Sequence, residues 1–190
     1  METFGYNTLE DRKNPEEVQN NGPFICTRAN AWLGHGYYFW EQDLERAHDW
    51  GRIAYSKSYM ICQADLNLPK ILDLLGNIAH RKYFKELISY LQSNFDAFKG
   101  ESKNIAIGHA IHFLRKINSR PKYKGVFDYD SVRAEDFPQK GSNKLPFAYG
   151  RPETFDLNSR VQICVFNKDL GNISHYKLVY PKEYLQAKAS

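Results

Sequence analysis

Residues 32–41 of the chain read WLGHGYYFWE, and residues 45–50 read ERAHDW. The first stretch places Gly34 and Gly36 directly before an aromatic run of the kind that favours β-strands, so a strand is expected over residues 36–40. The second stretch has early acidic residues and apolar residues near helical spacing, which predicts a helix over residues 41–56. Because the glycines precede a strand rather than a helix, this is neither a Rossmann fingerprint nor a phosphate-binding P-loop.

The composition is that of one folded domain, which we expect to span residues 1–190. The chain has 190 residues, of which 42% are hydrophobic and 25% charged, as in globular proteins. No apolar stretch is long enough to span a membrane and the N-terminus has no signal-peptide pattern, so a cytoplasmic protein without a membrane partner is expected.

Three distant cysteines argue against a disulfide framework and a zinc site. His109 and His112 have a spacing that can chelate a metal, but no third ligand is evident, so no metal is expected.

The remaining pattern predicts an α+β fold with a mixed or antiparallel sheet. A short helix is expected over PEEVQNN, residues 15–21. Apolar stripes at helical spacing predict two helices within a helical segment of about residues 70–120, the second closed by Pro121. Further strands are expected over residues 59–66, 125–132, 161–166 and 173–180.

Positive charge is concentrated in one part of the chain. Residues 102–127 contain six basic side chains and no acidic one, although the net charge of the whole chain is only +4. Such a stretch can form a surface that binds phosphates or an ordinary solvated helix end and loop. Its basic residues are Lys103, Arg115, Lys116, Arg120, Lys122 and Lys124.

Residues 34–50 resemble a segment of the ADP-ribosyltransferase superfamily, in its poly(ADP-ribose) polymerase-like and diphtheria-toxin-like branch. In that family a Gly-x-Gly-apolar-Tyr-Phe strand leads into a helix with an Ala and an aromatic residue, matched here by Ala47 and Trp50. Three weaker similarities lie in residues 5–8, 130–134 and 160–166.

The resemblance implies an ADP-ribosyltransferase-like fold, with two small sheets forming an NAD⁺ cleft and a helical insertion in the middle. In this family a His holds a ribose and the carboxamide region, a Tyr stacks on nicotinamide, and a Glu bonds a ribose hydroxyl. The chemistry is cleavage at an oxocarbenium-like centre that a nearby carboxylate stabilises.

Carried over to this chain, the resemblance implies that Tyr38 is the stacking residue. Asn7 or Tyr6 takes the position of the His, depending on whether Gly5 or Thr8 anchors the alignment. Gln162 stands where the Glu belongs. Arg133 binds the pyrophosphate, positions the target or forms surface salt bridges. The cofactor-binding set implied is Tyr6, Asn7, Thr8, Gly34, Gly36, Tyr38 and Trp50, and the catalytic set is Tyr38, Gln162 and Arg133.

The missing Glu is the main departure from the family pattern. Gln162 can still bond a hydroxyl but carries no charge, which argues against polymer synthesis and leaves mono-transfer or no catalysis. Glu41 is a substitute whose direction depends on where its strand ends. Other candidate carboxylates precede the strand of Gln162, at Glu135, Asp136, Glu153 and Asp156.

The resemblance therefore implies an NAD⁺-dependent mono-ADP-ribosyltransferase. In small bacterial members it implies a toxin of a toxin–antitoxin or phage-defence system, with a neutralising protein partner. The basic stretch favours RNA or DNA over protein as the acceptor. Two alternatives stay open: an inactive module of the same fold that binds NAD, a nucleotide or a partner, and a nuclease or nucleic-acid-binding domain.

Overall fold

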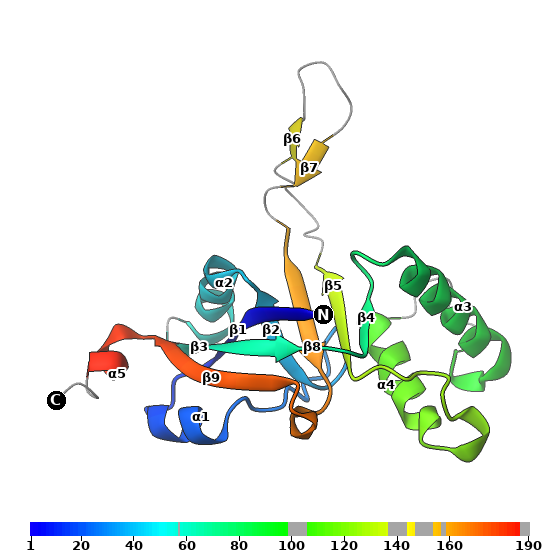
Figure 1. Cartoon of the computed structure of the whole chain (residues 1–190), viewed down its shortest axis with the longest axis horizontal. Coiled ribbons are helices and arrows are strands. Elements are labelled where there is room, and N and C mark those ends of the chain that lie inside the picture. The colour runs from blue at the N-terminus through cyan, green and yellow to red at the C-terminus, as the bar shows by residue number, and fades with distance from the viewer. Residues whose placement is uncertain (57, 99–105, 137–143, 147–153, 157–158, 187–190) are drawn as a thin grey trace.

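A seven-stranded mixed sheet forms the centre of the α+β fold (Figure 1). The computed structural model describes residues 1–56, 58–98, 106–136, 144–146, 154–156 and 159–186. All neighbouring strands of the large sheet are antiparallel except β4 and β5, which are parallel. In spatial order the strands are β4 (Ile71–Asp73), β5 (Ser131–Glu135), β8 (Val161–Val165), β2 (Tyr37–Glu41), β1 (Glu2–Glu10), β3 (Tyr59–Asn67) and β9 (Ile173–Tyr180).

Helices and short 3₁₀ turns surround this sheet. A separate two-stranded ladder joins β6 (Lys144–Pro146) to β7 (Thr154–Asp156) in the connection from β5 to β8. The α-helices are α1 (Pro15–Asn21), α2 (Leu44–Tyr55), α3 (Ile78–Asn94), α4 (Ile107–Asn118) and α5 (Lys182–Gln186). The 3₁₀ turns are η1 (Asp96–Phe98), η2 (Pro121–Tyr123) and η3 (Lys168–Leu170).

The two small sheets implied by the resemblance are hydrogen-bonded into one. Strands β4, β5, β8 and β2 form a first half-sheet, and β1, β3 and β9 form a second, which runs crosswise to it (Figure 1). The halves meet at β1 and β2, where only two residue pairs form, Gly5 with Glu41 and Tyr6 with Trp40. By contrast, nine pairs join β1 to β3. We call this short β1–β2 junction the seam.

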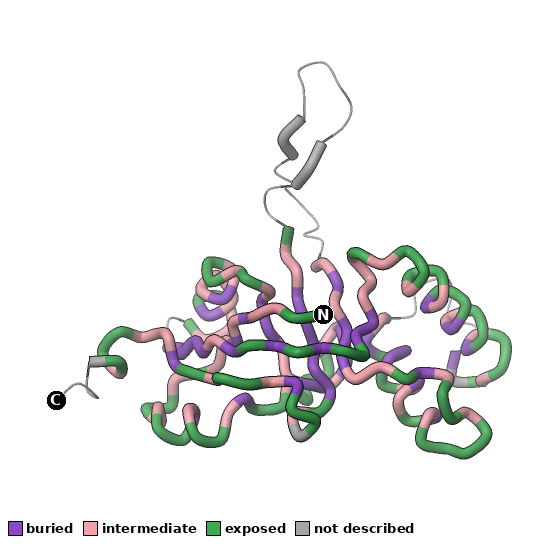
Figure 2. Tube along the Cα trace, viewed as in Figure 1, coloured by how far each residue is buried: buried purple, intermediate pink, exposed green. Residues whose placement is uncertain are grey.

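The core has separate clusters on the two faces of the sheet. Helices α3 and α4 cover the first half-sheet over buried side chains such as Val132 and Cys164. Helix α2 covers the second half-sheet and the seam, with Ala47 against Trp40. The crossed halves enclose a third cluster between them, with Phe39 and Ile163 facing Leu66. Buried positions therefore follow the strands, whereas the outer faces of the helices are exposed (Figure 2).

Strand β8 has both faces covered, which explains its nearly continuous apolar sequence. Ile163, Cys164 and Val165 are fully buried, although they point to alternating faces. Burying each large apolar side chain contributes roughly 1.5–3 kcal/mol to folding. This strand therefore anchors the first half-sheet.

Most expected elements are present, with two corrections to their bounds. The strand expected over residues 125–132 begins only at Ser131, because Asn118 Oδ1 accepts bonds from the backbone N–H of Gly125 (2.9 Å) and Phe127 (3.2 Å). Strand β1 has nine residues, of which the resemblance covers only residues 5–8. The helical segment begins at Ile78 rather than near residue 70, because residues 71–73 form β4, which pairs with β5.

Candidate functional site

A cleft of about 800 Å³ opens where β1 and β2 part beyond the seam. Its walls are the end of β1, strand β2, the C-terminal half of α2 and the loop of residues 24–32. The volume lies within the range of roughly 300–1,000 Å³ that is usual for small-molecule sites. We call this feature the aromatic cleft, because its lining includes the aromatic residues Phe24, Trp32, Tyr38, Phe39, Trp40, Trp50 and Tyr55.

Asn7 bridges the two strands where their backbone pairing stops. Its Nδ2 donates to the carbonyl oxygen of Tyr38 at 3.0 Å, and its Oδ1 accepts from the Tyr176 hydroxyl at 2.7 Å. The side chain is only 8% exposed, so both bonds satisfy a buried amide. Asn7 lines the cleft, whereas Tyr6 packs against the core beneath α2. Of the two residues considered for the His position, only Asn7 lines the cleft.

Tyr38 lies in the wall of the cleft with its hydroxyl already bonded. The hydroxyl donates to the carbonyl of Gly34 at 2.7 Å and accepts from the backbone N–H of Leu33 at 3.0 Å. Burial raises the pKa of this phenol above its usual range, so it stays neutral. A ligand in the cleft would therefore contact the Tyr38 ring, because the hydroxyl is already hydrogen-bonded.

Gly34 and Gly36 do not line the cleft, and each has a structural role instead. Gly34 has a φ of +90°, which a residue with a side chain rarely adopts. A Cβ on Gly36 would lie 2.5 Å from Cys164 Sγ and 2.5 Å from the Val165 carbonyl oxygen. These glycines shape the turn and let β2 approach β8, which places Tyr38 in the cleft.

Gln162 lies in the cleft with one end of its amide fixed. Its Oε1 accepts from Trp32 Nε1 at 2.7 Å, and the side chain is 9% exposed. In the described part of the chain its Nε2 has no hydrogen-bond acceptor. The amide therefore presents a donor to the cleft but no charge.

Thr8 and Trp50 also line the cleft. The Thr8 hydroxyl donates to the carbonyl of Ala47 at 2.9 Å, which ties β1 to α2. This bond holds the helix that carries Trp50 against the strand that carries Asn7.

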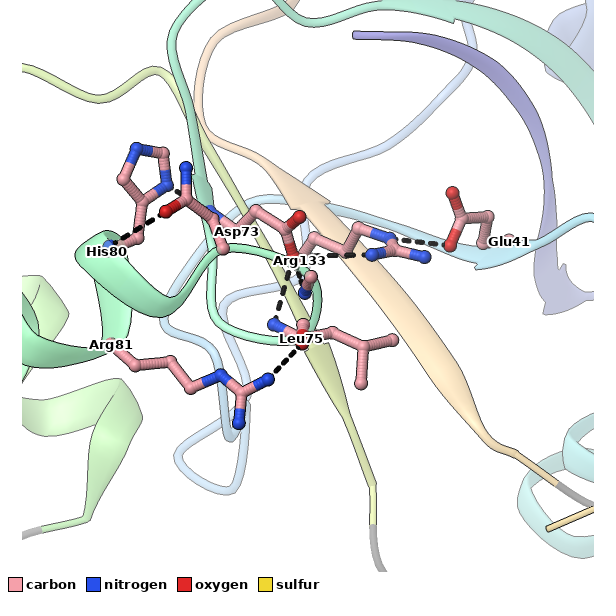
Figure 3. A network of polar contacts seen from close by, with 8 residues as sticks. Glu41, Asp73, Leu75, His80, Arg81 and Arg133 are labelled. Carbon is pink, nitrogen blue, oxygen red and sulfur yellow. Dashed lines mark hydrogen bonds and ion pairs between the residues drawn. The ribbon is translucent and has the colours of Figure 1, made fainter. Parts of the chain in front are cut away.

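Arg133 lies on the opposite face of the sheet from Tyr38. Register places Val132 opposite Cys164 and Tyr38 opposite Cys164, so Arg133, one residue on, points the other way. Its Nε donates to Glu41 Oε2 at 2.7 Å and its Nη1 to Asp73 Oδ1 at 3.3 Å (Figure 3). Arg133 does not line the cleft, and its guanidinium is ion-paired with these two carboxylates.

Glu41 belongs to the same ion-pair network. Strand β2 extends to Glu41, so this residue shares the face of Phe39 and points away from that of Tyr38. Burial opposes ionisation of Asp73, but the backbone N–H groups of Gly76 and Leu75 and the charge of Arg133 lower its pKa overall. The network joins β4, β5 and β2 and is structural.

Three carboxylates line the cleft: Glu10, Glu17 and Asp136. Of the substitutes considered from the sequence, only Asp136 is among them, and its Oδ2 lies 3.3 Å from Arg160 Nη2. Glu135 instead accepts from the Ser159 hydroxyl at 2.6 Å. Glu153 and the side chain of Asp156 lie outside the described residues.

Sequence reasoning missed the contribution of the loop of residues 24–32. Phe24, Cys26, Arg28 and Trp32 all line the cleft from this loop. Backbone bonds between Cys26 and Gly36, at 2.8 and 3.2 Å, fasten it to the start of β2. The polar, turn-rich sequence carried no periodicity that would have shown this wall.

The basic stretch is divided by the fold. Arg115 is partly buried, donates to the carbonyl of His35 at 2.9 Å and lies over the ring of Phe166 at 4.2 Å. Lys103 lies outside the described residues. The other four form an exposed basic surface at the end of α4 and around η2: Lys116, Arg120, Lys122 and Lys124.

His109 and His112 do not converge on a metal position. The ring of His109 lies 5.2 Å from that of Phe98, and the ring of His112 lies 5.2 Å from that of His35. Within the described ranges, no group of three or more His, Cys, Asp or Glu residues could hold a metal ion.

In those same ranges, no helix combines the length and the apolar character that crossing a bilayer requires.

Comparison with known proteins finds no matching family model, no matching curated protein and no matching solved structure. The fold and the site define an α+β protein with an aromatic cleft at the seam of a single mixed sheet.

Proposed function

We propose that this protein is an NAD⁺-dependent mono-ADP-ribosyltransferase whose substrate binds in the aromatic cleft. The observation that carries the proposal is convergence. Asn7, Tyr38, Trp50 and Gln162 come from four different elements, and all line the same cleft. The resemblance in residues 34–50 implies an NAD⁺-binding role for Tyr38 and Trp50, and the weaker similarities in residues 5–8 and 160–166 imply such a site for Asn7 and Gln162.

The cleft has the chemistry that such a dinucleotide needs. Its aromatic side chains offer flat surfaces on which a nicotinamide or an adenine ring can stack. Its volume of about 800 Å³ suits a ligand of this size. Tyr38 supplies a ring whose hydroxyl is held by Gly34 and Leu33 and so does not compete for the ligand.

Bound NAD⁺ supplies a labile bond between nicotinamide and ribose, whose breakage leaves positive charge on the ribose ring and on C1′. Gln162 Nε2 is positioned to donate to a ribose hydroxyl oxygen, because Trp32 holds the other end of the amide. Among the carboxylates that line the cleft, we assign to Asp136 the role of offsetting the developing positive charge. Its own negative charge is partly neutralised by Arg160. A neutral Gln162 makes this a slow, single-transfer site.

We propose nucleic acid, with RNA favoured, as the acceptor. Lys116, Arg120, Lys122 and Lys124 are exposed near one another in the chain, and in the described part of the structure none forms a salt bridge. Such a surface can neutralise backbone phosphates without reading sequence. As a toxin, the protein would arrest growth on expression and would need a neutralising partner.

The test is incubation of the purified full chain with labelled NAD⁺ and total cell extract, followed by ribonuclease or protease. We expect label in a ribonuclease-sensitive band. Tyr38→Ala should abolish transfer while the protein stays folded, whereas Tyr38→Phe, which keeps the ring, should retain it. Label only in protease-sensitive bands would make protein the acceptor.

A second candidate, a module that binds NAD⁺ without turnover, is favoured by the neutral Gln162 and the paired Asp136. In that case NAD⁺ would raise the melting temperature and remain intact. NAD⁺ that neither binds nor is cleaved would refute both candidates.

A further inference from the structure

Five charged residues of the described part of the chain line the aromatic cleft, and four of them have either an ion-pair partner or a short hydrogen bond. Glu10 and Arg12 form an ion pair at 2.8 Å, Glu17 accepts from Asn14 Nδ2 at 2.7 Å, and Asp136 pairs with Arg160. Arg28 is the exception. In the described part of the chain no carboxylate lies within ion-pair distance of its guanidinium.

Arg28 is held only weakly, by an aromatic side chain on the facing wall. Its Nη2 donates to the Tyr55 hydroxyl at 3.4 Å, which is longer than an ordinary N–H···O bond. Its guanidinium carbon lies 5.5 Å from the centre of the Tyr55 ring. Contacts of this kind are worth little at an exposed site, so a ligand can replace them at small cost.

The backbone that carries Arg28 is better fixed than its side chain. The Arg28 carbonyl accepts from Ala31 N–H at 3.0 Å, and two bonds between Cys26 and Gly36 secure the loop just before it. The guanidinium is therefore an exposed, weakly bonded group on a fixed backbone in the lining of the cleft.

We propose that Arg28 is the anion-binding residue of the aromatic cleft and takes the diphosphate of a nucleotide ligand. The planar guanidinium can donate two parallel hydrogen bonds to phosphate oxygens, and a cation without a carboxylate partner meets such an anion without first breaking an ion pair. The surrounding rings stack the base or nicotinamide on either side of the diphosphate. The identity of the ligand as NAD⁺ rests on the proposed function, but the preference for a diphosphate does not.

The test compares ADP with adenosine on the full-length protein by calorimetry, in the wild type and in two matched variants. Arg28→Gln removes the unpaired cation, whereas Arg12→Gln removes an arginine that lines the same cleft but pairs with Glu10. We expect the wild type to bind ADP about 10- to 100-fold more tightly than adenosine. Arg28→Gln should remove most of this preference and leave adenosine affinity unchanged, and Arg12→Gln should keep the preference.

Equal affinity of the wild type for ADP and adenosine would overturn the inference, as would an undiminished ADP preference in Arg28→Gln. If the wild type cleaves NAD⁺ and Arg28→Gln keeps the full preference for ADP over adenosine, the role of Arg28 is overturned but the proposed function stands. ADP binding that depends on Arg28, without binding or cleavage of NAD⁺, would uphold the anion site and refute the proposed function.

Discussion

Gln162 is the residue on which catalysis in the proposed site depends most. The amide keeps one bond to Trp32 and points a donor, rather than a negative charge, at the cleft. A glutamate of nearly the same shape could accept from the same Trp32 and add the missing charge. This makes the position suitable for a gain-of-function test.

We predict that Gln162→Glu raises the rate of NAD⁺ cleavage by about 10- to 1,000-fold, the range seen when one group that stabilises a transition state is added or lost. Initial rates at saturating NAD⁺ measure it. Gln162→Leu, which removes the donor and adds no charge, is the control and should be slower than the wild type. Wild-type rates in both variants would show that position 162 has no catalytic role.

Gly36 matters for packing rather than for ligand contact. A Cβ at this position would lie 2.5 Å from both Cys164 Sγ and the Val165 carbonyl oxygen, so β2 and β8 would have to separate. We expect Gly36→Ala to lower the free energy of unfolding by about 2–4 kcal/mol, measured by urea denaturation. Gly171→Ala, where nothing lies within 4 Å and only the φ of +69° is unfavourable, should cost about 1–2 kcal/mol. Equal losses would contradict the steric explanation.

At the scale of elements, the ion pair of Arg133 with Glu41 connects two strands, β5 and β2, that backbone hydrogen bonds do not join directly. Strand β8 lies between β2 and β5, yet Arg133 of β5 reaches Glu41 of β2 at 2.7 Å. The Glu41 side chain is 8% exposed and that of Arg133 is 19% exposed. Removing one partner would therefore leave a largely buried charge without compensation.

We predict that Arg133→Met destabilises the protein by about 2–4 kcal/mol, because Glu41 loses its partner in a poorly hydrated position. The double variant Glu41→Gln with Arg133→Met removes both charges and should recover at least half of that loss. Urea denaturation of the set measures the coupling. Transfer activity relative to the folded fraction should stay within about twofold of the wild type, since Arg133 does not line the cleft. A large selective loss of NAD⁺ binding would instead place Arg133 in the ligand site.

For the whole molecule, the distribution of charge bears on the proposed acceptor. The exposed basic surface at the end of α4 and around η2 lies at the opposite end of the fold from α5 (Figure 1). If RNA binds at this surface, its affinity would depend on which charged positions are changed. If RNA binding were nonspecific, its affinity would depend only on the net charge of the protein.

We predict that Lys116→Glu with Arg120→Glu weakens RNA binding at least 10-fold at low salt and reduces its salt dependence, because two phosphate contacts are lost. Lys177→Glu with Lys182→Glu makes the same change in net charge at exposed positions of β9 and α5, and should have little effect. Fluorescence anisotropy over a range of salt concentrations measures both. An equal loss of RNA affinity in the two variants would show that the basic surface is not the RNA-binding site.

Much of the fold could be predicted because local patterns specify its elements. Helix α1 and strand β9 have the bounds expected from residues 15–21 and 173–180. The start of the strand expected over residues 125–132 was wrong, because hydrogen bonds to Asn118 outweigh a weak β pattern in residues 125–130. The pairing of β1 with β2 was not predicted, since it joins distant segments.

The sequence by itself determined the aromatic strand, its glycines and the neutral Gln162, because these depend on residue type and short-range periodicity. Only the tertiary structure decided which side chains share the cleft. Strand alternation turned Arg133 away and into an ion pair. A loop without periodicity brought Arg28 into the cleft, where no carboxylate of the described residues pairs with it. Neither outcome can be obtained from one segment alone, because each depends on the register and crossing of strands far apart in the chain.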